Sequence, residues 1–271
     1  MKAKRFLSSA LLCFLVFSLS ACSVAPDAEI GQMEDVDKYS SPLVAVTRDG
    51  TVVSEYDTLL DAMNAFNNRE VNAFAIRLMG NHYCDALLPD MWQDVAIDLN
   101  GYKLTLSEGI GIDIYTGVFN FFDSRGGGLL SGNRETALIA ARSSSPSYNP
   151  AFVRIRFENI NIENTGPALY VYNQSYYFPL DVEIDGGKYL SAADNVLIID
   201  GWNPTIEISA GDFVSPPGIA ALKGCRGDLL MGMVYLLVEG SEIDTAAGEY
   251  ISLAPLVNNT AANKITVSIK P

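Results

Sequence analysis

The stretch that decides the fold is Val95-Ala96-Ile97-Asp98-Leu99-Asn100-Gly101. Its first and third residues are apolar and face the same side of an extended chain, because successive side chains of a strand point to opposite sides. Its last two residues are a strong turn signal. The same arrangement returns further along the chain, where Phe119 and Phe121 precede a turn at Gly126–Gly128. The sequence therefore repeats one short strand and one corner.

This pattern recurs between residues 93 and 253. Further pairs of apolar residues, each followed by a polar or glycine turn, are Ile160 and Ile162, Val182 and Ile184, Ile206 and Ile208, and Leu236 and Val238. The steps from Ile97 to Phe121, from Ile162 to Ile184 and from Ile184 to Ile208 are nearly equal in length. The two longer steps contain polar or glycine-rich stretches around Ser143–Pro150 and Lys223–Gly232, where we expect loop insertions.

A period in the low twenties is typical of a solenoid, in which the chain turns through several short strands and each coil stacks on the next. Every second side chain then points into a shared core. Leucine-rich repeats have a similar period, but their fixed leucine and asparagine spacing is missing here. A β-sandwich is the alternative, since turns about every 8 to 12 residues also suit it. The equal spacing favours an all-β solenoid.

Residues 43–80 have a different pattern and are expected to cover the open end of the first coil, because exposed strand edges recruit other chains. The segments predicted there are a hairpin, a capped helix and a strand of the first coil, at 43–47 with 51–54, Thr58 with Leu59–Phe66, and Ala73–Met79. At the far end, alternating polarity over Lys264–Lys270 predicts a final strand.

Three stretches resemble right-handed parallel β-helix proteins of bacterial surfaces, namely Asp98–Leu104, Phe121–Gly132 and Glu183–Tyr189. The resemblance covers roughly residues 43 to 255, and it rests mainly on corner residues, which specify architecture rather than activity. It implies the pectin-lyase-like fold, a right-handed parallel β-helix solenoid with an N-terminal capping hairpin and short helix, for a domain of residues 43–271. It implies no catalytic residue.

The N-terminus has the features of an export signal. Lys2, Lys4 and Arg5 are followed by an apolar run, Phe6–Leu19, that is short for a membrane span. The following Leu19-Ser20-Ala21-Cys22 resembles the bacterial lipoprotein signal, which implies cleavage after residue 21 and a diacylglycerol on Cys22. An ordinary secretory peptide with a chance cysteine is the alternative. The expected location is the bacterial cell envelope, outside the cytoplasm and anchored by lipid.

Charge and composition limit the classes of molecule that this chain is expected to bind. Removal of residues 1–21, which carry three cations and no anion, changes the formal charge from −14 to −17, and this disfavours nucleic acid as a partner. No other apolar run approaches the roughly 20 residues of a membrane span. Residues 22–42 are acidic and poor in large apolar groups, which predicts a tether between the lipid on Cys22 and the folded domain.

The cysteines give a geometric prediction. Cys13 leaves with the signal and Cys22 is acylated, so only Cys84 and Cys225 are left to form a disulfide. They lie some five coils apart, which at ~4.8 Å per coil is on the order of 20 Å. We therefore expect no disulfide between them.

Few residues suggest catalysis. Glu183 and Glu207 are each flanked by inward apolar residues, so they are expected to point outward from neighbouring coils about 4.8 Å apart, where they would share a proton, bind Ca²⁺ or act as acid and base. A solvated face is the alternative, because no Arg or Lys is expected beside them; Arg154 and Arg156 are placed at a strand edge. The single histidine, His82, is expected in a surface loop. No metal site and no cofactor are predicted.

Aromatic residues are more suggestive of binding. In Leu169-Tyr170-Val171-Tyr172 the two tyrosines face outward if the aliphatic residues face the core, and Tyr176, Tyr177 and Trp202 lie nearby in the sequence. Such rings suit the apolar faces of sugars or the binding surface of a partner protein. Burial against an insertion such as Ser143–Pro150 is the alternative.

These observations predict a non-enzymatic, lipid-anchored surface protein, adhesin-like, that binds an extracellular glycan or protein. The alternative function is that of a polysaccharide lyase or glycoside hydrolase acting through Glu183 and Glu207. A purely structural component of the envelope is the third interpretation.

Overall fold

The computed structural model describes residues 41–143, 152–173, 180–201, 204–216, 219, 221–225, 235–238 and 263–267. All of them belong to the compact unit Lys38–Pro271. The signal sequence, Cys22 and most of the acidic tether lie outside the described residues, as do Tyr176, Tyr177 and Trp202.

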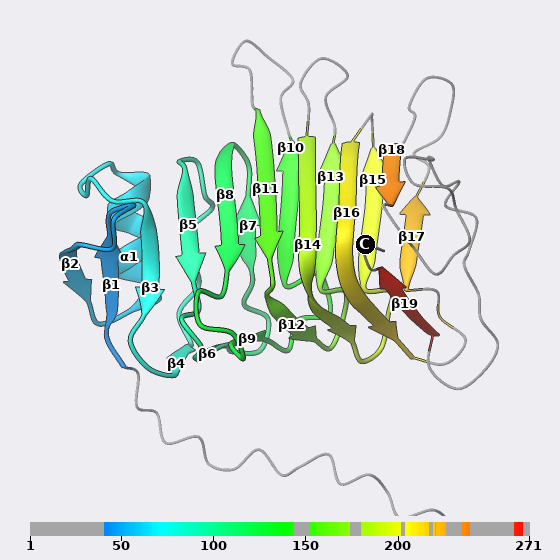
Figure 1. The fold of residues 1–271 in the computed structure, drawn as a ribbon, viewed down its shortest axis with the longest axis horizontal. Helices are drawn as coiled ribbons and strands as arrows, with labels where there is room; N and C mark the ends of the chain where they lie inside the picture. Colours follow the sequence, from blue (N-terminus) through cyan, green and yellow to red (C-terminus); the bar gives the residue numbers. More distant parts are fainter. Residues whose placement is uncertain are drawn as a thin grey trace, which may run out of the picture. The chain divides into compact units, whose positions relative to one another are not determined.

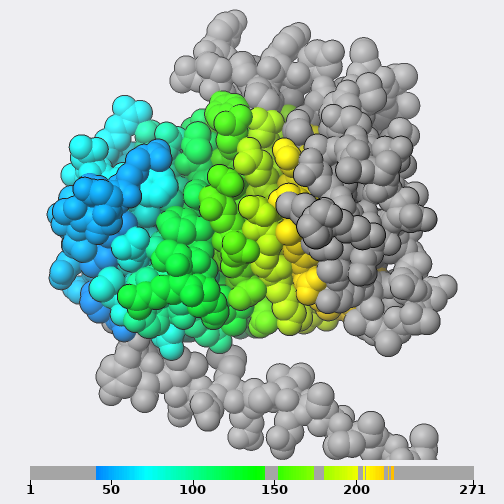
Figure 2. Space-filling model, in the orientation of Figure 1, coloured from blue at the N-terminus to red at the C-terminus, as the bar shows by residue number. Residues whose placement is uncertain are grey.

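The described chain forms a parallel β-solenoid of about four turns, as the period predicted (Figure 1). Its coils contribute strands to three stacks. The first stack contains β3 (Ala75–Leu78), β5 (Val95–Asp98), β8 (Gly117–Phe122), β11 (Val153–Glu158), the first halves of β14 (Leu180–Ser191) and β16 (Pro204–Ser215), and β18 (Tyr235–Val238). In the space-filling view the coils follow one another as bands of colour from blue to yellow (Figure 2).

The other two stacks complete each coil. The second contains β4 (His82–Cys84), β6 (Lys103–Leu106), β9 (Leu129–Ser131), β12 (Asn161–Asn164) and the second halves of β14 and β16. The third contains β7 (Ile112–Ile114), β10 (Ile139–Ser143), β13 (Leu169–Asn173), β15 (Leu197–Gly201) and β17 (Leu222–Cys225). Because β14 runs through the corner between the first two stacks, these form one sheet, while the third stack forms a separate five-stranded sheet.

The predicted N-terminal cap is confirmed. β1 (Leu43–Val46) pairs antiparallel with β2 (Val52–Tyr56) on one side and with β3 on the other. The helix α1 (Leu59–Asn67) follows, and the Thr58 hydroxyl caps it by accepting a hydrogen bond of 3.1 Å from the Asp61 amide. Its apolar face is buried, including Leu59 and Met63.

The far end of the ladder also has a strand, as predicted. β19 (Asn263–Val267) pairs antiparallel with the second half of β16. The remaining residues of the predicted strand, 268–270, lie outside the described residues.

A column of aromatic side chains runs along the core. Phe121, Phe157, Tyr189 and Phe213 come from successive coils, and each is at most 2% exposed. The rings of Phe121 and Phe157 stack with centroids 5.3 Å apart, and those of Tyr189 and Phe213 stack at 4.9 Å. Phe157 meets Tyr189 edge to face at 6.2 Å. The column joins the coils through side chains as well as through backbone hydrogen bonds.

The corners explain why glycine recurs at the same phase of the repeat. Gly187 lies at the bend of β14 with φ +93, and a Cβ atom there would collide with the backbone carbonyl of Ile160 in the preceding coil. Glycine is therefore required both by the backbone conformation and by the close approach of the neighbouring coil.

One corner varies most in length. The links from the third stack to the first are short at residues 115–116 and 202–203, and long at 144–152, 174–179 and 226–234. Both predicted insertions fall at this corner. The second was predicted to begin at Lys223, but β17 continues to Cys225, so the predicted start of that insertion was too early.

Cys84 is a buried free thiol, in agreement with the expectation that it does not pair with Cys225. Its place in β4 and the place of Cys225 in β17 put them on different stacks and several coils apart. Within the described ranges, no helix has the length and hydropathy needed to cross a membrane.

His82 is 3% exposed in β4, so the prediction of a surface loop is wrong. The turn-forming residues beside His82 suggested a loop, but the segment is a strand that pairs with β6. Alternation along β4 points the imidazole inward. The His82 Nδ1–H donates a hydrogen bond of 2.9 Å to the carbonyl of Ser41. Burial lowers the pKa of His82 below its ordinary value of 6.5, and the bond to Ser41 opposes this effect.

This burial predicts a pH dependence of stability. Because the folded-state pKa of His82 is lower than that of the unfolded chain, the unfolded state takes up the proton first as the pH falls. The contribution of neutral His82 is complete above about pH 6.5 and is lost as the pH falls toward the folded-state pKa. We expect the free energy of unfolding to decrease more between about pH 7.5 and 5.5 in the wild type than in His82→Gln, as measured by urea unfolding. Equal decreases would contradict the assignment.

Candidate ligand-binding surfaces

The outer face of the first stack carries a row of polar and mostly charged side chains, which we call the charged face. It consists of Asn120 on β8, Arg154, Arg156 and Glu158 on β11, Asp181 and Glu183 on β14, and Glu207 on β16. The register places Glu183 directly beside Glu207, so the predicted adjacency of the two glutamates is confirmed.

Arg156 lies beside the glutamate pair, contrary to expectation. β11 pairs with β14 so that Arg156 and Glu183 are register partners, and the Arg156 Nε atom is 3.6 Å from Glu183 Oε2 and 3.3 Å from Glu158 Oε1. Arg154 is 3.5 Å from Asp181 in the same way. Both arginines lie on a strand that has neighbours on both sides, so their placement at a strand edge was wrong. Arg156 and Glu183 are separated by more residues than one period of the repeat, and this concealed the register.

The charged face is open rather than enclosed. The side chains of Arg156 and Glu183 are 48% and 41% exposed, so water weakens their ion pair. Asn120 donates a hydrogen bond of 3.1 Å from Nδ2 to Glu158. Among the residues that the structure describes, no three His, Cys, Asp or Glu side chains are grouped as a metal site would require.

The tyrosine pair lies on the third stack. Tyr170 and Tyr172 alternate in β13 with buried Leu169 and Val171, and both rings are half-buried, as alternation predicted. Their ring centroids are 6.0 Å apart and their planes differ by 14°. The Tyr170 hydroxyl donates a hydrogen bond of 3.3 Å to Asp200 on β15. The pair therefore has a fixed ring geometry.

One arginine lies beside the tyrosine pair. Arg142 on β10 is the register partner of Tyr172. It lies 3.6 Å from Asp113, whose other oxygen is 2.9 Å from Arg134. The Asp113 carboxylate is shared by two guanidinium groups, and the Asp200 carboxylate lies beside the rings as the register partner of Tyr172.

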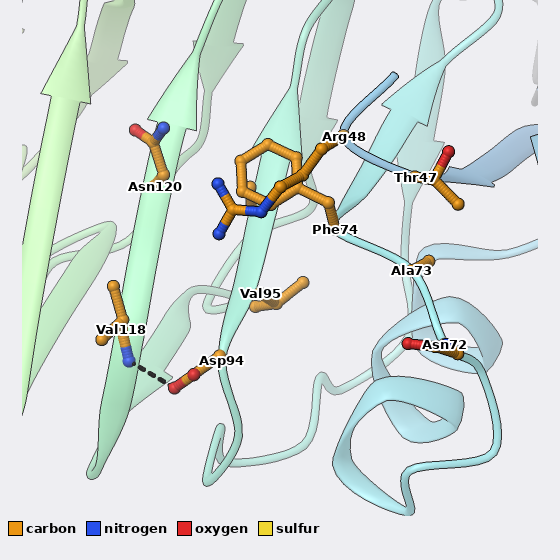
Figure 3. Close-up of a pocket in the computed structure, with 10 residues that line it drawn as sticks. Thr47, Arg48, Asn72, Ala73, Phe74, Asp94, Val95, Val118 and Asn120 are labelled. Carbon is orange, nitrogen blue, oxygen red and sulfur yellow. Dashed lines mark hydrogen bonds between the residues drawn. The ribbon is translucent and has the colours of Figure 1, made fainter. Parts of the chain in front are cut away.

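A groove of about 410 Å³ lies between the cap and the first coils (Figure 3). Arg48, which follows β1, extends across the ring of Phe74, with its guanidinium carbon 4.5 Å from the ring centroid. Asp94 immediately precedes β5, and its Oδ1 accepts a hydrogen bond of 2.8 Å from the Val118 amide. Val118 and Asn120 form the opposite wall on β8.

A second hollow of about 600 Å³ adjoins this groove and shares Asn72, Ala73 and Asp94 with it. Its main feature is Trp92, which is 49% exposed and stacks on Tyr115 with centroids 5.0 Å apart and planes 15° apart. We call the two hollows together the junction cleft.

The junction cleft was missed from the sequence. Its residues come from four separate segments, and only two of these, around Val95 and around Asn120, belong to the repeated pattern. The signal available was Trp92, which stands among polar and turn-forming residues rather than in an apolar run.

Comparisons with protein-family models, with curated proteins and with solved structures gave no match for this chain.

Proposed function

We propose that this chain is a lipid-anchored protein of a bacterial cell envelope whose solenoid binds an extracellular glycan or protein without turning it over. In this proposal Cys22 carries the lipid and anchors the chain to the membrane, and the acidic segment 22–42 holds the domain away from its surface. The solenoid is right-handed and of the pectin-lyase-like type. The lipoprotein-like Leu19–Cys22 and the stacked coils support these assignments.

The observation that carries the binding function is the pair Tyr170 and Tyr172. Their rings are nearly parallel, they stand on a strand with neighbours on both sides, and one hydroxyl is tied to Asp200. Amphipathic rings held in place in this way lose little conformational entropy when a sugar or a protein side chain packs on them. A glycan is the better fit, because the adjacent Asp200 and Arg142 offer polar partners for its substituents.

This proposal predicts that Tyr172→Ala weakens binding at least about tenfold, because truncation of a central aromatic contact costs roughly 2 kcal/mol. Binding of the full-length protein in detergent to a glycan array, followed by calorimetric titration of each bound glycan, measures the effect. Tyr83→Ala is the matched control, since Tyr83 is also half-buried but lies in β4 on another stack. Equal affinities of Tyr172→Ala and wild type would refute the tyrosine site.

The polysaccharide lyase or glycoside hydrolase is kept as the second candidate, because Arg156 stands beside Glu183 and Glu207. Neighbouring strands are ~4.8 Å apart, which is close to the ~5 Å between the carboxyl groups of retaining glycosidases. Incubation with uronate-containing and neutral polysaccharides distinguishes the two functions. Turnover that Glu207→Gln abolishes supports the enzyme, and saturable binding without product supports the binding protein.

A further inference from the structure

The junction cleft combines the parts of a saccharide site. Sugars present an apolar C–H face and a rim of hydroxyl groups, so they are held by an exposed ring together with planar polar side chains. One face of Trp92 packs on Tyr115, and the indole is nevertheless 49% exposed, which leaves its other side for a ligand. The stacking on Tyr115 fixes the plane of the indole before any ligand arrives.

Polar groups of the cleft are positioned next to this ring. Asp94 is held by the hydrogen bond from the Val118 amide to its Oδ1. Gly117 permits this contact, because it has φ +112 and a Cβ atom there would press on the same carboxylate oxygen. Asn72 is exposed on the wall that the two hollows share. Carboxylate and amide groups at fixed positions are suited to hydrogen bonds with sugar hydroxyls.

Arg48 provides the third element, a positive charge. Its guanidinium is held against the Phe74 ring at 4.5 Å and is directed across the groove toward β8 (Figure 3). Among the described residues, no carboxylate lies within ion-pair distance of it. A planar guanidinium with unused N–H groups matches a carboxylate or sulfate in two parallel hydrogen bonds. In a chain of net charge −14, this guanidinium is a cation suited to an anionic group.

We propose that the junction cleft is a saccharide-binding site for an acidic oligosaccharide, in which Trp92 stacks on a sugar ring, Asp94 and Asn72 bind hydroxyl groups, and Arg48 binds a carboxylate or sulfate. The site is separate from the tyrosine pair and goes beyond the proposed function, because it lies on the cap and the first coils rather than on the third stack. It stands even if Tyr170 and Tyr172 bind nothing.

The test uses the full-length protein in detergent and an array of neutral, carboxylated and sulfated oligosaccharides, with a carboxyl-reduced form of each carboxylated one. We expect binding of acidic oligosaccharides that Trp92→Ala weakens roughly tenfold or more. Arg48→Met is expected to weaken binding of the carboxylated or sulfated form about tenfold and to leave the carboxyl-reduced form unchanged. Arg48→Lys keeps the charge but loses the planar guanidinium, so its affinity for the acidic form is expected to fall between those of the wild type and Arg48→Met.

Controls separate the outcomes. Leu87→Ala removes an 82% exposed side chain outside the cleft and is expected to bind like the wild type. If Trp92→Ala lowers the melting temperature, the test of the site depends on the Arg48 variants, because Arg48 is exposed and its replacement is not expected to disturb the fold. In a Trp202→Phe background Trp92 is the only indole, so its fluorescence reports binding at the cleft and not at the tyrosines. Absence of acidic-oligosaccharide binding, displacement by acidic peptides alone, or equal loss for the acidic and reduced forms in Arg48→Met would each overturn the proposal.

Discussion

Phe157→Ala is expected to lower the free energy of unfolding by about 3–5 kcal/mol, which is the usual cost of replacing a fully buried phenylalanine by alanine. Phe157 is 2% exposed and lies in the aromatic column between Phe121 and Tyr189. Its removal leaves a cavity that these rings cannot fill, because backbone hydrogen bonds hold each in its own coil. Urea unfolding followed by circular dichroism measures the change.

Phe157→Leu is the matched control for this prediction. A hydrophobic replacement of similar size usually costs less than about 1.5 kcal/mol, so the leucine variant should be much more stable than the alanine variant. A loss below about 1 kcal/mol in Phe157→Ala would mean that the coils are not joined through their interior.

The second large effect is expected for Asp98→Ala. Asp98 is fully buried, and its Oδ2 lies 2.8 Å from Arg77 Nε and accepts a hydrogen bond of 2.9 Å from the Ser124 hydroxyl. Its Oδ1 accepts hydrogen bonds from the amides of Asn100 and Ser124, at 2.9 and 3.1 Å. Alanine leaves these donors without their acceptor inside a corner, which costs on the order of 3 kcal/mol.

Two variants test the cause of that loss. Asp98→Asn retains a carbonyl oxygen for the two amides and is expected to lose less stability than alanine. Arg77→Met removes only the ion pair, and because Arg77 is 28% exposed its effect should be the smallest of the three. If Arg77→Met destabilised the protein as much as Asp98→Ala, the loss of the cation beside the buried carboxylate would be as costly as the loss of the corner hydrogen bonds. Thermal and urea unfolding of the three variants measure this order.

The repeat could be predicted from the sequence because the strands and corners of each coil are encoded by residues close together in the chain. Val95 and Ile97, and Phe119 and Phe121, face the core as alternation requires, and Asn100 and Gly101 adopt the positive φ angles of a corner. The third stack was less visible. Its strands are linked to the next coil through the corner of variable length, so their pairing depends on contacts that no local pattern encodes.

The candidate site was predictable only where the repeat is regular. Glu183 and Glu207 are separated by one period of the repeat and are therefore adjacent. The separation of Arg156 from Glu183 is longer than that period, so their distance in sequence did not indicate that the two are neighbours.

The junction cleft could not be predicted because the repeat relates only its walls on β5 and β8, while its other residues come from the cap and from the segment before β5. Arg48 belongs to the turn after β1, Phe74 precedes β3, and Trp92 precedes β5. Only the antiparallel pairing of β1 with β3 brings Arg48 to the ring of Phe74. Burial of His82 was missed for a similar reason, since its partner Ser41 is far away in the sequence.

The corner that varies most in length, between the third and the first stacks, accepts changes of chain length that leave the stacked strands unchanged. The rise from one coil to the next is set by hydrogen bonds between strands, at ~4.8 Å, whatever length of chain is inserted at residues 144–152 or 174–179. Epitopes or affinity tags grafted into these links would therefore be spaced at regular intervals along the solenoid axis. Their sequences can change from one variant to the next without altering the interior.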